Sequence, residues 1–200
     1  MTPKLFWSYA RGRRLAVIAG IALLAAAGAA LYEHLAPGRV ESALFTATMP
    51  AVAVGICAGL SINSPYGELD DAVFLPLRRI RLFGFLAALG FAMVAFAALA
   101  WWWDRPVAAA TLGRDLVGFA GLTVVAMRLL SVSRAWMPGF AWGIFTLVAT
   151  PEGWSYSRWA WHLRPADDPT SWVVALALFG AGLVTLWRMP FRPAAVFDLD

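Results

Sequence analysis

Residues 82–103 read LFGFLAALGFAMVAFAALAWWW, an uninterrupted run without a charged side chain. About 20 consecutive apolar residues are enough to cross the hydrocarbon core of a bilayer as an α-helix. The run therefore predicts a transmembrane helix, which Arg81 precedes and Asp104 follows.

The rest of the chain has the same character. Its 200 residues are 61% hydrophobic and only 14% charged, with a mean hydropathy of +0.69. An ordinary soluble domain is about half apolar and about a quarter charged. Because the apolar runs show no period-two alternation, helices and not a closed barrel must satisfy the backbone in lipid. We expect an all-α polytopic membrane protein in which residues 1–200 form a single transmembrane domain.

Six membrane spans fit the chain best. We expect them at about 15–32, 43–62, 82–103, 116–130, 136–150 and 172–187. The region 116–150 is too long for one untilted helix at 1.5 Å per residue, and Ser131, Pro138 and Gly139 supply a reversal within it. A five-span chain with one broken helix in this region is the alternative.

Basic residues set the predicted orientation, because cytoplasmic loops carry an excess of Lys and Arg. With the N-terminus inside, the cytoplasmic segments hold Lys4, Arg11, Arg13, Arg14, Arg78, Arg79, Arg81, Arg134, Arg188 and Arg192. The opposite loops hold fewer basic residues, diluted by acids: Arg39, Arg105, Arg114, Arg158 and Arg164. We therefore expect a multi-pass protein of the cell membrane with both termini in the cytoplasm.

Tryptophan is also distributed unevenly. The predicted outer face holds Trp101, Trp102, Trp103, Trp154, Trp159, Trp161 and Trp172. An aromatic belt at the membrane interface explains most of this enrichment without a ligand.

A charged strip, SPYGELDDAVFLPLRRIRLF at residues 64–83, separates the second and third spans. In the predicted orientation residues 63–81 form a cytoplasmic loop. Ser64 can cap a short helix that carries its acids in the early turns, where the helix dipole favours negative charge, and that ends at Pro76. Three arginines then mark the return to the lipid and can contact phosphate headgroups: Arg78, Arg79 and Arg81. A solvated interhelical loop is the alternative reading.

The strip resembles the first cytoplasmic loop of small actinobacterial permeases of the ABC-2 exporter type, in which a Ser-Pro turn, an acidic pair and a Pro-Leu-Arg segment recur. A second patch, GFAGLTVVAMRLLSVSRAWMPGFAW at residues 118–142, is similar to the same family. Two further segments match its architecture. LFWSYARGRR at residues 5–14 suits an N-terminal amphipathic interfacial helix within the basic segment 1–14. Residues 151–170 suit an outer excursion between spans five and six.

The resemblance implies a permease subunit whose cytoplasmic strip is a coupling helix on a separate ATPase subunit. The implied partner contacts are Glu68, Leu69, Asp70, Asp71 and Val73, with Arg78, Arg79 and Arg81 as membrane anchors. The chain lacks the GxxxxGK[ST] loop, so ATP and Mg²⁺ are expected on the partner and no cofactor or enzymatic site on this chain. The other expected partners are membrane lipids and a second permease, which is either an identical copy or a different paired chain. We attribute the net positive charge of the chain to its orientation in the membrane, so no nucleic-acid partner is expected. The expected substrate is hydrophobic or amphipathic.

The predicted spans also contain an arginine, spaced glycines and a cysteine that could have a functional role. Arg128, near the cytoplasmic end of span four, is either an intramembrane functional residue or a side chain that reaches back to the headgroups. The glycines of 55–59 and of 139–143 have GxxxG spacing, which we attribute to packing within the chain. Cys57, the single cysteine, is read as a buried small hydrophobe.

The two histidines, His34 and His162, are both predicted outside, with WWWDR at 101–105 between them in sequence. They could ligate a haem iron, as in haem-handling proteins that are similar in outline, and a non-transporting scaffold or cofactor-handling protein is therefore the alternative function. Histidines at the membrane interface are the simpler explanation. We expect the acids to lie in loops, which disfavours a proton-coupled carrier.

Overall fold

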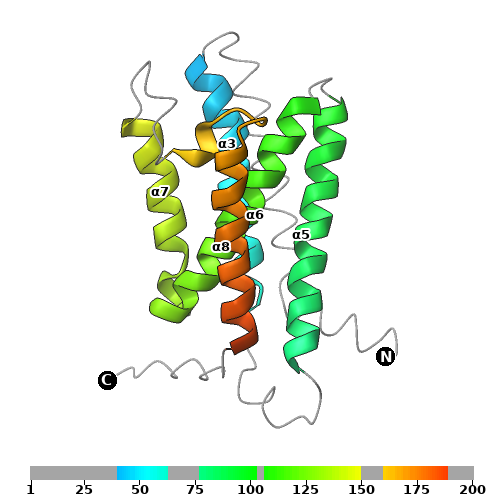
Figure 1. Cartoon of the computed structure of the whole chain (residues 1–200), viewed down its shortest axis with the longest axis vertical. Helices are drawn as coiled ribbons and strands as arrows, with labels where there is room; N and C mark the ends of the chain where they lie inside the picture. Colours follow the sequence, from blue (N-terminus) through cyan, green and yellow to red (C-terminus); the bar gives the residue numbers. More distant parts are fainter. Residues whose placement is uncertain (1–39, 63–76, 103–105, 150–159, 189–200) are drawn as a thin grey trace.

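The computed structural model describes residues 40–62, 77–102, 106–149 and 160–188. Within these ranges the elements are α3 (Val40–Leu60), α5 (Leu77–Trp102), α6 (Pro106–Leu129), η1 (Val132–Arg134), α7 (Trp136–Ala149), η2 (Trp161–Leu163) and α8 (Pro169–Arg188). The two η elements are single 3₁₀ turns, and the described residues contain no strand. The long helices stand side by side as a bundle (Figure 1). The all-helical fold class is confirmed.

Helix α6 is the central element of the bundle. It contacts each of α3, α5, α7 and α8, and Leu116, Phe119, Ala120 and Val124 on it are fully buried. Figure 1 shows α3, α6 and α8 running in one direction and α5 and α7 in the other. Since α6 is surrounded, its packing against the neighbours decides the shape of the core.

Glycines allow two of these neighbours to approach α6 closely. A Cβ placed on Gly121 would lie 2.5 Å from the Leu178 carbonyl oxygen, and one on Gly182 would lie 2.9 Å from the Cα of Gly121, so α6 and α8 touch backbone to backbone. Gly55 and Gly59 bring α3 close to α6 as well. Small residues at helix contacts are the usual solution in membranes, where dispersion contacts and not water exclusion drive association.

The prediction that the GxxxG pairs pack within the chain is confirmed for both. A Cβ on Gly55 would meet Phe119 at 3.0 Å, and a Cβ on Gly59 would meet Thr123 at 2.7 Å. Gly139 and Gly143 on α7 face the side chains of α3, at residues Ile56 and Val52.

The predicted reversal between spans four and five is also confirmed. Helix α6 ends at Leu129, Ser131 is extended with φ −82° and ψ 160°, and η1 leads into α7. Pro138 is the third residue of α7, where its missing N–H removes no intrahelical hydrogen bond. Two separate helices therefore stand where the alternative placed one broken helix.

Two predicted boundaries are wrong. Helix α6 begins at Pro106, ten residues before the predicted start of the fourth span at 116. Proline is favoured at a first helical position because its fixed φ suits the helix, and the following residues up to 112 are mostly apolar. Helix α5 begins at Leu77, so Arg78, Arg79 and Arg81 lie in its first turns and not in the predicted loop 63–81. The predicted first span at 15–32 and both termini lie outside the described residues.

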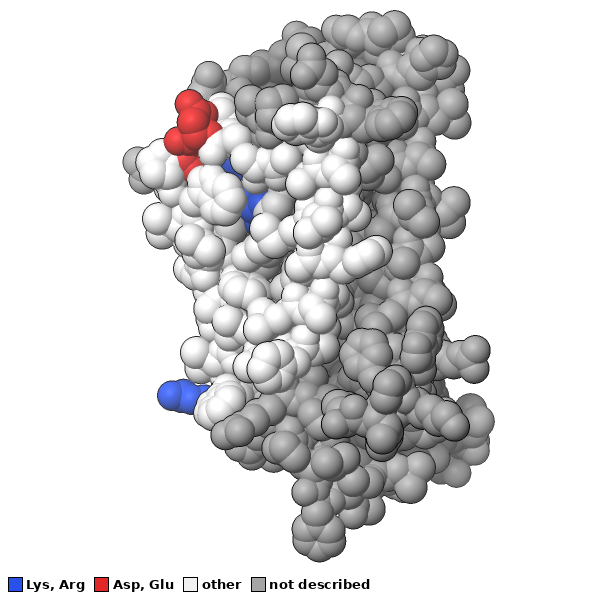
Figure 2. Space-filling model, turned by 90° about the vertical axis from the view of Figure 1, so that its right-hand side faces the viewer, with Lys and Arg blue, Asp and Glu red and all other residues white. Residues whose placement is uncertain are grey.

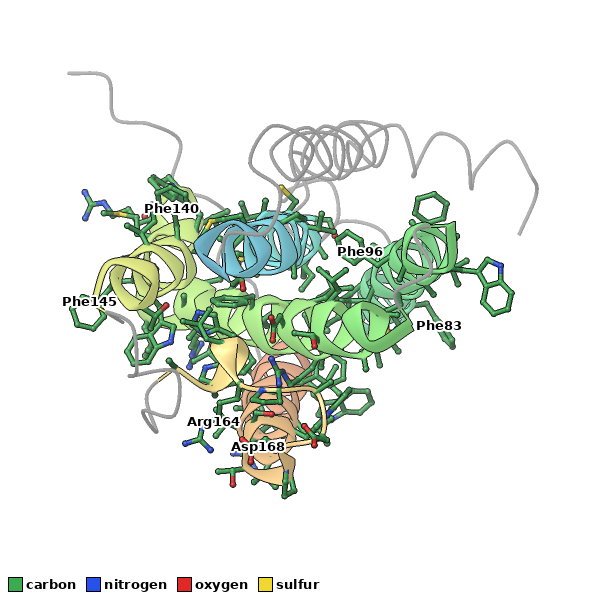
Figure 3. All side chains as sticks on the ribbon, turned by 90° about the horizontal axis from the view of Figure 1, so that it is seen from above. Phe83, Phe96, Phe140, Phe145, Arg164 and Asp168 are labelled. Carbon is green, nitrogen blue, oxygen red and sulfur yellow. The ribbon has the colours of Figure 1, made fainter. Side chains whose placement is uncertain are left out.

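Within the described residues, two helices are long and apolar enough to cross a membrane: Ala109–Leu129 and Pro169–Arg188. The outer faces of the bundle expose large apolar side chains, among them Phe83 at 70% on α5 and Phe145 at 61% on α7. Phe83, Phe140 and Phe145 point away from the bundle in Figure 3. In Figure 2 acidic side chains gather near one end with a small basic patch beside them, and below that patch the described surface is uncharged down to a basic side chain near the other end. Such an apolar band suits a lipid environment better than water.

Candidate functional site

The most densely bonded polar group of the described chain is Arg114, which lies fully buried in α6. Its Nε donates to Oδ1 of the adjacent Asp115 at 2.9 Å. Its Nη1 donates to Oγ of Ser171 on α8 at 2.8 Å, and its Nη2 donates to the His162 carbonyl oxygen in η2 at 2.7 Å. Each of the three guanidinium nitrogens therefore has an acceptor.

The same guanidinium also holds the chain that follows η2. Nη1 lies 3.0 Å from the carbonyl oxygen of Arg164 and 3.1 Å from that of Pro165. Buried carbonyls without a donor are costly, and a buried charge needs both a counter-charge and hydrogen bonds. Arg114 meets both demands at once, because it joins α6, the 162–165 segment and the first turn of α8 into one unit. We call this unit, formed by Arg114, Asp115, His162 and Ser171, the arginine clamp.

Asp115 supplies the negative charge of the arginine clamp. Both its side chain and that of Arg114 are 0% exposed. Its Oδ1 accepts the bond from Arg114, and its Oδ2 has no hydrogen-bond partner among the described atoms. Removing Arg114 would therefore leave a buried carboxylate with no counter-charge in the described chain.

His162 is the second ionisable side chain of the arginine clamp. Its Nε2 lies 2.8 Å from the hydroxyl of Thr146 on α7, and that hydroxyl is also within donating distance of the Trp142 and Gly143 carbonyl oxygens. When the hydroxyl donates to one of these carbonyls, Nε2 must carry the proton and donate to Thr146; in the other tautomer the hydroxyl donates to Nε2. Burial, and then the charge of Arg114, lower the pKa of His162 to about 3, so the ring is neutral at physiological pH.

Aromatic rings enclose this histidine. The rings of Phe119 and Trp161 each lie with their centroids 5.4 Å from that of His162, in edge-to-face arrangements. A Cβ on Gly118 would meet the Trp161 ring at 2.3 Å, so the indole lies directly on the α6 backbone. The 160–163 segment is therefore fixed to the bundle both by hydrogen bonds and by aromatic packing.

Asp168 starts α8 immediately beside the arginine clamp. Its carboxylate accepts the backbone N–H of Thr170 at 3.3 Å and of Ser171 at 3.2 Å, as an N-cap residue does before Pro169 at the first helical position. Arg164 Nη1 donates to Asp168 Oδ2 at 2.8 Å, and chiefly that bond holds the pKa of Asp168 below its usual value. Figure 3 shows Arg164 and Asp168 together at this end of the bundle.

The arrangement has the chemistry of a structural clamp. Every nitrogen of Arg114 is already bonded within the chain and the side chain is fully buried, so it is not accessible to an anionic ligand. The described residues contain no group of three or more potential metal ligands. A haem iron at His162 would have to displace the Thr146 bond or enter between the rings of Phe119 and Trp161.

The residues predicted as a coupling site fall into two groups. Glu68, Leu69, Asp70, Asp71 and Val73 lie outside the described residues, as does His34. The three anchoring arginines of 78–81 lie on the first turns of α5. Arg128 is exposed in the last turn of α6, which is the position expected of a side chain that reaches back to the headgroups. Cys57 is half-buried in α3.

Three sequence-based placements at the opposite end are wrong. Arg114 was predicted in an outer loop, but it lies in α6, because Asp115 neutralises it within the helix. Asp115 likewise contradicts the expectation that acids lie in loops. His162 and Trp161 were predicted at the interface, but they are 0% and 5% exposed, since the arginine clamp draws their segment into the bundle.

Sequence reasoning missed the arginine clamp altogether. The adjacent pair Arg114–Asp115 interrupts an apolar stretch and could have been read as a neutralised pair within a helix, which is the signal that was available. Its acceptors lie about 50 residues further along the chain, and nothing in the sequence indicates that pairing.

In comparisons with known proteins, no protein-family model, no curated protein and no solved structure matches the chain.

Proposed function

We propose that the chain is a multi-pass cell-membrane permease subunit of an ABC-2-type exporter. In this proposal a separate subunit binds and hydrolyses ATP with Mg²⁺, and this chain performs no hydrolysis of its own. Residues 64–76 are the contact with that subunit, both termini are cytoplasmic, and two permease copies form the transport pathway.

The observation that carries the proposal is the position of the helices on either side of residues 63–76. Figure 1 shows α3 ending and α5 beginning at the same end of the bundle. Ile62, Phe85, Met127 and Leu186 belong to one buried cluster, which joins that end of α3 to α5, α6 and α8. A force applied to the intervening strip would therefore act directly on two helices that reach the core.

The two flanking helices differ in how fully they are packed against the rest of the bundle. The described face of α3 is packed at the core, with Ala51, Val54 and Ala58 at 0% exposure. Helix α5 lies at the periphery and exposes Phe91 at 67% and Val94 at 69%. Displacement of the strip would thus move α5 relative to a fixed α3–α6 pair, which is the kind of motion that alternating access requires.

Charge at this end supports the proposed orientation. The helix ends there carry Arg128 and Arg188, and the reversal at η1 carries Arg134. An arginine-rich end is expected to face the cytoplasm, where an ATPase subunit would be found. The exposed apolar faces of α5, α7 and α8 suit lipid contact and, between two copies, a hydrophobic or amphipathic substrate.

The test is the composition of the native complex. The tagged chain is extracted from its own host in mild detergent, and the proteins that copurify at stoichiometric level are identified by mass spectrometry. We expect a subunit with a GxxxxGK[ST] nucleotide loop, lost when Glu68, Asp70 and Asp71 are all changed to lysine. The matched control is Asp167→Lys, an exposed acid at the opposite end, which should leave the complex intact.

Folding of each variant is checked by size-exclusion chromatography and by its unfolding midpoint. A chain that copurifies with no nucleotide-binding protein, even when extracted directly into lipid nanodiscs, would show that the exporter proposal is wrong. Retention of the ATPase subunit after the triple reversal would remove the coupling role from this strip and leave the subunit assignment in place.

A further inference from the structure

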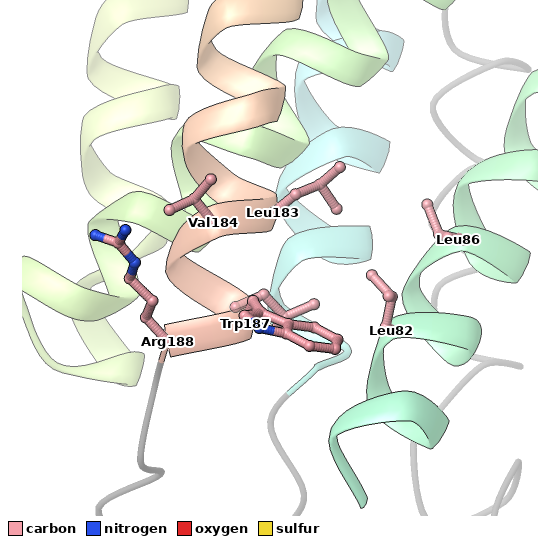
Figure 4. Close-up of a pocket in the computed structure, with 7 residues that line it drawn as sticks. Leu82, Leu86, Leu183, Val184, Trp187 and Arg188 are labelled. Atoms are coloured by element: carbon pink, nitrogen blue, oxygen red, sulfur yellow. The ribbon is translucent and has the colours of Figure 1, made fainter.

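An apolar groove lies between α5 and α8 at the arginine-rich end. It encloses about 430 Å³, within the range of small-molecule sites. Leu82 and Leu86 line it from α5, and α8 contributes Leu183, Val184, Trp187 and Arg188. In Figure 4 the leucines of α5 face Leu183 and the Trp187 indole across the gap, and Arg188 extends beside Val184 along α8.

The groove lies beside an aromatic contact between the two helices. The rings of Phe85 and Phe179 stack with centroids 6.1 Å apart and join α5 to α8. One turn nearer the arginine-rich end, Leu82 and Leu183 are only partly buried, and Leu86, next to Phe85 on α5, is 40% exposed. Apolar side chains in a concave, incompletely filled surface favour an apolar ligand.

The charge around the mouth of the groove indicates that an apolar ligand bound there carries a negatively charged headgroup. Arg188 is the last residue of α8 and is exposed. Two further arginines lie at the same end of the bundle, Arg128 in the last turn of α6 and Arg134 in η1. The described acids lie toward the other end of the bundle: Glu41 at the start of α3, Asp115 in the first half of α6, and Asp167 and Asp168 just before α8. Basic pockets between helices at the cytoplasmic face are typical sites for anionic lipid headgroups.

A flexible acyl chain suits this groove. Apart from Arg188, its lining side chains are leucines, a valine and a tryptophan, and a chain of methylenes can follow their uneven surface by rotation about its own bonds.

We propose that this groove binds one acyl chain of an anionic phospholipid, with the headgroup phosphate held by Arg188. The site requires the chain to lie in a membrane, but it does not require an ATPase partner. It goes beyond the proposed function, and its test is therefore performed on the chain alone.

The experiment uses the purified full-length chain in phosphatidylcholine nanodiscs that contain phosphatidylglycerol with a photoreactive acyl chain. After irradiation, the labelled peptides are located by mass spectrometry. We expect labelling to concentrate on the peptides that contain Leu82–Leu86 and Leu183–Trp187, and unlabelled phosphatidylglycerol to compete better than phosphatidylcholine.

Two matched pairs of variants isolate the groove and the charge. Leu183→Trp fills the groove and should reduce its labelling to the level of the exposed apolar surface, whereas Leu176→Trp, on an exposed position of the same helix, should not. Arg188→Gln should weaken competition by phosphatidylglycerol about fivefold, the effect of one basic residue near a charged surface. Arg134→Gln, at the same end but outside the groove, is its control and should have no effect on groove labelling.

Three results would overturn the proposal. These are labelling spread evenly over the exposed faces of α5, α7 and α8, equal competition by phosphatidylcholine, and crosslinking of the groove residues to a second copy of the chain. The last result would identify the groove as a protein interface. Arg188→Gln changes an exposed side chain, so the charge test remains informative even if the groove-filling variant does not fold.

Discussion

Replacing Gly121 with alanine tests the backbone contact between α6 and α8. The added Cβ would lie 2.5 Å from the carbonyl oxygen of Leu178 and from the Cα of Phe179. Ordinary van der Waals contact begins near 3.4 Å, so α8 has to move away by about 0.9 Å. Because the obstacles are backbone atoms, no side-chain rotation can relieve the overlap.

The cost is best measured against Gly180→Ala. A Cβ at Gly180, also within the α6–α8 pair, would meet nothing within 4 Å. Both substitutions gain the same helix propensity, up to about 1 kcal/mol, and that gain cancels in the comparison. Overpacking a close contact costs about 1–3 kcal/mol, so Gly121→Ala should be less stable than Gly180→Ala by that amount.

The assay is equilibrium unfolding in mixed micelles of a mild detergent and sodium dodecyl sulfate, followed by circular dichroism. Surface substitutions without specific contacts change stability by no more than about 0.5 kcal/mol. If the two alanine variants differ by less than this, α6 and α8 are not in backbone contact and the central packing described above is wrong.

Three further predictions concern the arginine clamp and the orientation of the bundle. Arg114→Gln should lower the free energy of unfolding by about 3–5 kcal/mol, because it leaves a buried carboxylate without its counter-charge; Arg128→Gln, an exposed control, should change it by no more than about 0.5 kcal/mol, and equal effects would contradict the clamp. The pKa of His162 is lowered from 6.5 to about 3, so as pH falls the unfolded chain takes up a proton on this ring before the folded chain does. The contribution of the neutral ring to the free energy of unfolding is therefore fully present above pH 6.5 and decreases between pH 6.5 and pH 3. When the unfolding assay is repeated across this pH range, the free energy of unfolding of His162→Gln should fall less between pH 6.5 and pH 3 than that of the unchanged chain. An identical pH dependence in the two proteins would count against a buried neutral ring. Cysteines placed singly at Arg134 and Asp167 in a cysteine-free chain should react with an impermeant maleimide from opposite sides of the membrane; labelling of both from one side would refute the orientation.

Local sequence features anticipated the reversal between α6 and α7. Ser131, Pro138 and Gly139 act within a few residues of their own positions, by ending one helix and permitting the start of the next. The glycines at 55 and 59 were likewise readable, because a small residue every four positions lies on one helix face and permits close approach whichever helix faces it.

Helix ends were less predictable where charge interrupts an apolar run. A hydropathy pattern excludes Arg114 and Asp115 from a span, since each alone is costly in lipid. In the structure they neutralise each other inside α6, and the helix continues back to Pro106. The expectation that all acids lie in loops fails for the same reason, so that argument against a proton-coupled carrier no longer holds.

Composition and apolar periodicity by themselves determined that this chain is helical and apolar enough for a membrane, because those properties depend only on residues near one another in sequence. Only the tertiary structure decided that α6 is the central helix and that Arg114 joins it to His162 and Ser171, 48 and 57 residues away. It also decided that an apolar groove lies between α5 and α8. The physical reason is that burial and hydrogen bonding are completed by groups distant in sequence, and a buried charge is tolerated only where the folded chain brings its partners to it.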